Sequence, residues 1–345
     1  MIDREEMIRQ NDECRKAYRD GIAAYIERLN SEGHQKREAF MPPASFFPHI
    51  EEYRQKYIRM LGLDRLESDS LPLPTLTLIS EEEAVDIYRL TLAVTPEIPR
   101  FGLLFVPRGT KAAPLVIAQH GSGGTPELCA DLHGPNKYAH MVRRALDRGA
   151  VVFAPQLLLW NHAAEKPHQR THPLPFDRNH TDKDLKRFGS SITALEIRGI
   201  MNAITYLASL SFVDADKIGM VGHSYGGYFT LCTMAADTRI KAGFSGGVFN
   251  DRNRHCGFDW GYKDAANTFQ DAEIAALCAP RKLFVTVGEK DELFNVSSAK
   301  EEAARAKRYF EGAGCPQNFA FSTWEGEHAF PDSDEGFAFL FSALS

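Results

Sequence analysis

The sequence lacks the features of several large classes of protein. No apolar run in its 345 residues is long enough to cross a bilayer, so we expect no membrane-spanning helix. Residues 1–13 are charged throughout and lack the apolar centre of a signal peptide, which predicts a soluble protein of the cytoplasm. The net charge of −6 gives no reason to expect nucleic acid as a partner.

Cysteine is also scarce. The six cysteines are scattered along the chain with no close pairs. This spacing argues against a zinc ribbon and supplies no disulfide framework, so reduced thiols are the expectation. A hydrophobic content of 43% is nevertheless enough to bury a large core, which fits one big α/β domain with an accessory piece.

The first 71 residues have a helical pattern. Residues 3–30 repeat apolar side chains at spacings of four, four, three and four, namely Cys14, Tyr18, Ile22, Tyr25 and Leu29. A break at Pro42 and Pro43 precedes a second amphipathic stretch that ends near Leu61. Because two short helices make a poor core alone, we predict that 1–71 is a helical extension of a main domain. It either acts as a lid or subunit contact or simply covers a sheet edge.

Strand and helix patterns alternate over residues 72–345. Strands are expected at 73–79, 86–94, 101–106, 113–119, 150–155, 217–221, 242–246, 282–287 and 318–323. Helices are expected at 138–148, 190–210, 271–278, 297–312 and 333–344. This alternation predicts an α/β fold with a mostly parallel, doubly wound sheet, whose active site lies at the carboxyl ends of the strands.

The rest of the chain is organised around a short turn between one buried strand and one helix. Gly-His-Ser-Tyr-Gly occupies 222–226, directly after the strand that begins at Lys217. Glycine is needed on both sides of so sharp a turn, because side chains there would collide with neighbouring backbone. Ser224 at the apex is then strained and exposed at a helix N-terminus, as in the nucleophile elbow of hydrolases. The alternative is a serine in an ordinary tight turn.

A serine hydroxyl becomes a good nucleophile only when a base takes its proton and a carboxylate holds that base. Two later strands end in turns that supply these groups in the order acid, then histidine. The turn at 288–292 contains Asp291, which we choose over Glu289 and Glu292 as the acid. The next strand ends just before His328, which we predict to be the base. The sequence therefore predicts a catalytic triad of Ser224, Asp291 and His328.

A glycine-rich loop, His120-Gly-Ser-Gly-Gly124, follows another buried strand. In this arrangement the loop supplies half of an oxyanion hole, which needs two backbone N–H donors. We predict that Tyr225 provides one donor and that Ser122, or its neighbour Gly123, provides the other. The alternative is a glycine-rich turn without a catalytic role.

These motifs resemble those of α/β-hydrolases in the dienelactone hydrolase and acetyl xylan esterase-like group. The resemblance rests on HGSGG at 120–124, GHSYGG at 222–227, APRKLFVTVGEKDELF at 279–294 and GEHAF at 326–330. It covers about residues 72–345 and implies an α/β-hydrolase fold with an eight-stranded sheet. It also implies hydrolysis of carboxylic esters, including acetyl esters of sugars. Dienelactone hydrolases use a cysteine as the nucleophile. This chain has Ser224 at that position, so it departs from the residue that their reaction requires.

Two insertions are expected to shape the pocket. Residues 159–180 hold Trp160 and four histidines whose spacing matches no standard metal site, so we predict a polar loop without metal. Residues 249–262 include Trp260, whose ring suits the apolar face of a sugar, although a structured surface loop is the plain alternative. The residues that we assign to substrate binding are His120, Gly123, Trp160, His223 and Trp260.

The sequence therefore predicts a serine carboxylesterase that acts on a small-molecule or oligosaccharide ester without metal or organic cofactor. One alternative is a serine peptidase of the prolyl oligopeptidase type, which shares the sheet and the triad. Another is a non-catalytic binding protein on the same fold, although such proteins usually lose a triad member. A homo-oligomer built through the N-terminal helices is also compatible with the sequence.

Overall fold

The protein is described by a computed structural model that covers residues 3–66, 70–132, 137–157, 177–255 and 257–345. Its centre is a nine-stranded sheet with the strand order β1-β2-β3-β5-β4-β6-β7-β8-β9. The strands are β1 (Thr75–Glu81), β2 (Val85–Thr95), β3 (Ile98–Pro107), β4 (Ala113–Gln119), β5 (Val151–Pro155), β6 (Val213–His223), β7 (Ile240–Gly246), β8 (Lys282–Gly288) and β9 (Phe319–Trp324). The pairs from β5 to β9 across the sheet are parallel, whereas β1, β2 and β3 pair antiparallel.

This arrangement confirms the α/β-hydrolase fold and corrects the number of strands. The sheet contains nine strands, which matches the nine strand patterns in the sequence rather than the eight strands that the resemblance implied; β1 pairs with β2 as an antiparallel edge strand. The elbow strand is also longer than expected. It starts at Val213 rather than Lys217, since the polar residues before the apolar run already pair with β4.

Helices cover both faces of the sheet. They are α3 (Pro126–Cys129), α4 (Met141–Leu146), α5 (Arg178–Arg187), α6 (Ile192–Leu207), α7 (Tyr225–Ala236), α8 (Ala265–Thr268), α9 (Asp271–Ala276), α10 (Val296–Gly312) and α11 (Glu335–Phe341). Successive residues of β4 join opposite cores: Leu115 and Ile117 pack with α6 and α7, whereas Val116 and Ala118 pack with α4 and α11. The strand alternation of period two thus builds a separate core on each face.

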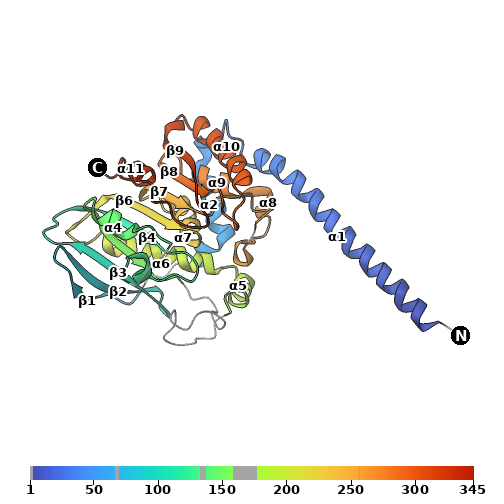
Figure 1. Cartoon of the computed structure of the whole chain (residues 1–345), viewed down its shortest axis with the longest axis horizontal. Helices are drawn as coiled ribbons and strands as arrows, with labels where there is room; N and C mark the ends of the chain where they lie inside the picture. The colour runs from blue at the N-terminus through green and yellow to red at the C-terminus, as the bar shows by residue number, and fades with distance from the viewer. Residues whose placement is uncertain (1–2, 67–69, 133–136, 158–176, 256) are drawn as a thin grey trace.

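The N-terminal part is helical, as predicted, but it differs in length and placement. Helix α1 runs over Arg4–Phe40, ten residues beyond the predicted end, and α2 covers Ile50–Leu61. Helix α2 joins the core through Tyr57 and Leu61. Helix α1 leaves the body beside α8 and α10 and extends away from it as one long rod (Figure 1).

Only the C-terminal end of α1 is anchored to the body. Gly33 and Arg37 are its two buried residues. The Arg37 side chain is fully buried, and its Nε atom lies 2.9 Å from the Glu273 carboxylate in α9. Across the ranges that the structure describes, no helix is long and apolar enough to span a membrane.

Candidate active site

Ser224 stands at a sharp turn between β6 and α7. Its φ of 57° and ψ of −121° lie outside the regions that L-residues normally occupy. The flanking glycines make the turn possible: a Cβ atom on Gly222 would lie 2.2 Å from the backbone oxygen of Gly226. The backbone is therefore strained at the residue that the sequence singled out, and its side chain is held at the carboxyl edge of the sheet.

The structure brings the three predicted triad residues together. The Nε2 atom of His328 lies 2.9 Å from the Oγ atom of Ser224. The Nδ1 atom of the same ring lies 2.9 Å from the Oδ2 atom of Asp291. Asp291 follows β8 and His328 follows β9, so both reach Ser224 from the same edge of the parallel sheet. A hydroxyl, an imidazole and a carboxylate in this chain of hydrogen bonds can activate the hydroxyl as a nucleophile.

The neighbouring carboxylates take no part in this chain. Glu289 instead accepts a hydrogen bond from the Thr323 hydroxyl at 2.9 Å, and Glu292 is exposed. Asp291 turns inward because its Oδ1 atom accepts hydrogen bonds from the backbone N–H groups of Leu293 and Phe294, both at 2.9 Å. An Asx turn of this kind leaves Oδ2 for the histidine.

The pKa of Asp291 is lowered from its usual value. Burial is the largest influence and acts in the opposite direction, by disfavouring the charged form. The hydrogen bonds from His328 and from the backbone N–H groups of Phe294 and Leu293 outweigh it. The carboxylate is thus held in its charged form, which is the form that can orient and balance an imidazolium.

The loop at 120–124 lies against the nucleophile, and its Gly121 is next to Ser224. A Cβ atom on Gly121 would lie 3.1 Å from the Cβ atom of Ser224. The Gly121 N–H donates to the Tyr138 hydroxyl at 3.1 Å, so the next donor along the loop is the N–H of Ser122. Ser122 is exposed, and Gly123 beside it has a φ of 68°, which a glycine adopts without strain. Tyr225 begins α7, where the first backbone N–H groups lack intrahelical acceptors.

His120 and His223 are buried behind the site. The Nε2 atom of His120 accepts from the Leu157 N–H at 3.1 Å, and its Nδ1 atom lies 2.8 Å from the Gly121 oxygen. The His223 ring packs 4.8 Å from the His328 ring. Burial lowers the pKa of His120 to about 4 and that of His223 to about 3, so both rings are neutral at pH 7. These contacts indicate that both rings support the site from behind. Contact of either ring with the substrate stays a prediction.

The insertion after β7 packs over the start of α7. Only 7% of Trp260 is exposed, and its ring lies 4.9 Å from those of Tyr225 and Tyr228. The Tyr225 hydroxyl donates to Asp259 at 2.6 Å, and the Arg178 guanidinium also binds Asp259. Trp260 therefore forms part of a wall rather than an open sugar platform. Trp160 lies outside the described residues.

Two aromatic rings lie near the triad: Phe294, which the sequence patterns did not indicate, and His255, which belongs to the insertion at 249–262 that was expected to shape the pocket. The Phe294 ring stacks on His328 with a centroid separation of 5.6 Å, and the half-buried His255 ring lies 4.4 Å from Phe294. Phe294 belongs to the Asp291 turn, where we weighed only the charged residues. The signal that could have found it is the apolar pair Leu293–Phe294 at the end of that charged stretch.

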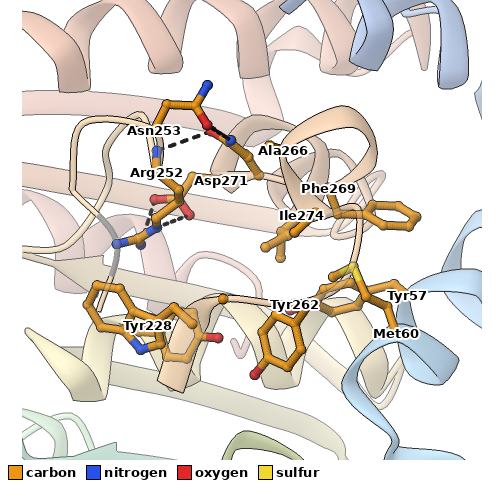
Figure 2. A pocket seen from close by; sticks show the side chains of 14 residues that line it. Tyr57, Met60, Tyr228, Arg252, Asn253, Tyr262, Ala266, Phe269, Asp271 and Ile274 are labelled. Carbon is orange, nitrogen blue, oxygen red and sulfur yellow. Dashed lines mark hydrogen bonds and ion pairs between the residues drawn. The ribbon is translucent and has the colours of Figure 1, made fainter. Parts of the chain in front are cut away.

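A cavity of about 140 Å³ has Trp260 among its lining residues, and Figure 2 shows this cavity from close by. Its walls come from α2, α7 and the segment that leads into α9, and they include Tyr57, Met60, Tyr228 and Phe269. Figure 2 shows Arg252 bound to Asp271 at one side of it, with Tyr262 and Met60 opposite. None of the triad residues lines this cavity, so it is separate from the reacting groups.

No metal centre is seen in the part of the chain that the structure describes. Within those ranges, no group of three or more histidine, cysteine or acidic side chains is placed to hold a metal ion. Most of the histidine-rich stretch at 159–180 falls outside them. His180, which is described, lies 3.3 Å from Asp184 on the exposed face of α5.

Comparison with known proteins supports a hydrolase. The prolyl oligopeptidase family model matches residues 194–299, which hold the elbow and Asp291. A protein of Bacillus subtilis (strain 168) named as the hydrolase YtaP is 32% identical over 120 residues, which are 32% of this chain and 40% of that protein. The match thus spans well under half of the relative's length.

Solved structures match over much more of the chain. Methylesterase BT1017 has a TM-score of 0.68 at 19% identity and covers 93% of this chain and 68% of its own. A glucuronoyl esterase from Solibacter usitatus has a TM-score of 0.60 at 16% identity, over 85% and 92% of the two chains. An acetyl xylan esterase from Paenibacillus sp. R4 has a TM-score of 0.59 at 15% identity, over 85% and 95%. The chain has the α/β-hydrolase fold that these esterases share.

Proposed function

We propose that the protein is a serine esterase whose catalytic triad is Ser224, His328 and Asp291. One observation carries the proposal: an unbroken chain of hydrogen bonds joins the three side chains at a strained strand–helix turn. Each residue comes from a different strand end, so this chain of bonds depends on the whole sheet. A structural role for the three groups would not require the strained backbone at Ser224.

The geometry supports a two-step acyl transfer. The Oγ atom of Ser224 attacks the ester carbonyl carbon while its proton passes to the Nε2 atom of His328. The carbonyl oxygen becomes an oxyanion, which the N–H groups of Ser122 and Tyr225 stabilise. When the intermediate collapses, the same proton goes to the departing alcohol, leaving an acyl-enzyme. Water then gives its proton to His328 and attacks the acyl carbon, and the acid leaves as the proton returns to Ser224.

For the substrate we propose a small acyl ester, with the acetyl ester of a carbohydrate as the favoured form. Support comes from the fold shared with acetyl xylan, methyl and glucuronoyl esterases. The rings of His255 and Phe294 beside His328 add an aromatic surface next to the reacting atoms. Aromatic faces of this kind suit the apolar side of a sugar ring.

A serine peptidase is the second candidate, because the prolyl oligopeptidase family model matches residues 194–299. The triad alone does not discriminate, since the same three groups cleave esters and amides. The choice depends on the leaving group that the pocket accepts, which substrate tests can decide.

The test is hydrolysis of p-nitrophenyl acetate, butyrate and octanoate, of acetylated xylo-oligosaccharides and of a prolyl p-nitroanilide, with Ser224→Ala as the control. We expect turnover of acetate and release of acetate from the sugars, both abolished in Ser224→Ala. If only the simple esters are turned over, the esterase proposal stands and the proposal of a carbohydrate substrate is wrong. Preferential anilide cleavage would favour the peptidase. If Ser224→Ala changes nothing, or if a fluorophosphonate fails to label Ser224, the catalytic role is wrong.

A further inference from the structure

Helix α1 carries an apolar stripe that no other described part of its own chain covers along most of its length. Residues 7–28 are all exposed, and the bare apolar side chains are Met7, Ile8, Tyr18, Ile22, Tyr25 and Ile26. Cys14 and Leu29 complete the stripe at helical spacing. Helices in proteins are stabilised mainly by packing of an amphipathic face, and this segment lacks that packing against the described residues.

The stripe continues the face that already packs on the body. Leu29 is followed at helical spacing by Gly33 and Arg37, which are buried. A Cβ atom on Gly33 would lie 3.0 Å from the Ala266 backbone oxygen, and the Arg37 Nη1 atom donates to the same oxygen at 3.2 Å. One helix face thus serves as an interior surface at its C-terminal end and stays bare over the preceding turns (Figure 1).

The opposite face of α1 is charged and exposed to solvent. Ion pairs at helical spacing join Arg9 to Glu13 and Lys16 to Asp20 on this face. Helix α1 contains eight acidic and eight basic residues, so it has no excess of positive charge. Helices that lie on anionic membranes are rich in lysine and arginine on the polar face. This balance favours a protein surface over a lipid surface.

We propose that the free segment of α1, residues 4–29, pairs antiparallel with the same segment of a second copy of this chain. Charge along one edge of the stripe carries the proposal. Glu5, Asp12 and Arg19 are seven residues apart and therefore line a single edge, acidic toward the N-terminus and basic beyond it. Two identical helices packed antiparallel bring the same edges together, so the acidic part of each faces the basic part of the other.

The length of the free segment sets the register. Full overlap of residues 4–29 places residue 4 of one helix opposite residue 29 of the other. Ile8 then lies opposite Tyr25, and Asp12 lies within about one turn of Arg19 of the other copy. Both contacts occur twice, once on each side of the two-fold axis, as an isologous interface requires. A parallel pair would set this edge beside the other edge of the stripe, so Asp12 and Arg19 of the two copies would not meet.

The first experiment is sedimentation equilibrium of the full-length protein over a concentration series. We expect twice the mass of the chain for the wild type and a monomer for Ile22→Glu, which places a charge in the stripe. Glu27→Lys, on the opposite face of the helix, is the matched control and should remain dimeric. Helix content by circular dichroism checks that each variant is folded.

A charge exchange tests the antiparallel arrangement directly. Asp12→Arg alone places the new guanidinium against Arg19 of the other copy, and Arg19→Asp alone sets two aspartates together. Each should weaken self-association by roughly tenfold. In an equal mixture, both pairs are complementary again, so the mixture should dimerise at a protein concentration at which each variant alone is mostly monomeric. Failure of the mixture to dimerise would overturn the antiparallel pairing.

Two further outcomes would overturn the proposal as a whole. One is a dimer that persists in Ile22→Glu, because the interface then lies elsewhere. The other is a wild-type protein that stays monomeric and sediments with phosphatidylglycerol vesicles, because α1 would then bind lipid. Neither result depends on the proposed esterase activity, so the two proposals fail separately.

Discussion

The Nε2 atom of His328 lies 2.9 Å from the Oγ atom of Ser224, across 104 positions of sequence. The two residues follow different strands, β9 and β6, with β7 and β8 between them in the sheet. Parallel strands end at the same edge, and the loops that follow them converge there. Their meeting is therefore a property of the sheet topology.

The strained backbone at Ser224 should cost stability. Ser224→Gly removes the Cβ atom that disfavours a φ of 57°, so we expect the free energy of unfolding to rise by about 1–3 kcal/mol. Ser224→Ala keeps the Cβ atom and should not show this gain, although both variants lose esterase activity. Guanidinium unfolding of the two variants measures the difference. Equal stabilities would mean that the turn stores no strain.

Asp291→Asn should reduce kcat/KM for p-nitrophenyl acetate by about 10²–10⁴-fold, because an amide cannot balance the charge that His328 acquires. Glu289→Gln is the matched control, since Glu289 bonds to Thr323 instead, and its kcat/KM should stay within about twofold. The lowered pKa of Asp291 also contributes stability that is present above its usual pKa and is lost as the pH falls through its lowered value. The stability advantage of wild type over Asp291→Asn should therefore shrink at acidic pH.

Burial of His120 and His223 makes stability depend on pH. Their pKa values fall from 6.5 to about 4 and about 3, so between those values the unfolded chain binds protons that the folded protein does not. The free energy of unfolding should decrease as the pH falls from about 6.5 to about 4, by up to about 1.4 kcal/mol per pH unit for each ring. His120→Gln should lower this slope in urea titrations at several pH values. An unchanged slope would contradict the assignment.

Gly226→Ala should disrupt the elbow. Its Cβ atom would lie 2.0 Å from the backbone oxygen of Gln119 and 2.8 Å from that of His120. Both oxygens lie at the end of β4, which is held between β5 and β6 in the sheet. We expect a loss of at least about 3 kcal/mol of stability together with the activity. Gly261→Ala is the control, because nothing lies within 4 Å of its Cβ position, and it should change stability by less than about 0.5 kcal/mol. Similar effects of the two substitutions would be evidence against this tight approach.

Arg37→Met should be costly, because it leaves the buried Glu273 carboxylate with fewer partners. We expect a loss of about 3 kcal/mol, moderated by the second contact of Glu273 with Arg305 at 3.3 Å. The pair of the exposed Arg308 with the half-buried Glu38 also joins α10 to α1, and Arg308→Met should cost less than about 1 kcal/mol because the guanidinium stays in contact with water. Thermal unfolding of both variants measures the contrast, and equal shifts would show that burial is not the cause.

Sequence patterns were sufficient for the parts of the fold that local chemistry dictates. The glycine spacing around Ser224 marks the turn because only glycine fits there, and the order of acid and histidine follows from strand succession. The choice of Asp291 over Glu289 rested on position within the turn. The structure supplies the physical reason, since the Asp291 side chain caps its own turn through two backbone N–H groups.

Other features depend on packing that no local pattern encodes. The sequence shows His120 and His223 beside catalytic motifs but not that both rings point into the interior. Trp260 looked like a surface aromatic because the ion pair of Asp259 with Arg178, 81 positions away, is invisible in sequence. The further ten residues of α1 were missed for a related reason, since the helix continues past the point where its apolar signal fades.

The near-complete burial of α7 has a consequence for how the protein loses activity. Every residue from Gly226 to Ala236 is buried, and β6 runs beneath them. Backbone amides in such a unit exchange with deuterium only when the whole domain opens. We therefore expect these amides to be among the slowest to exchange, and we expect the heat-inactivation curve to coincide with the global unfolding curve, with no inactive folded species between them.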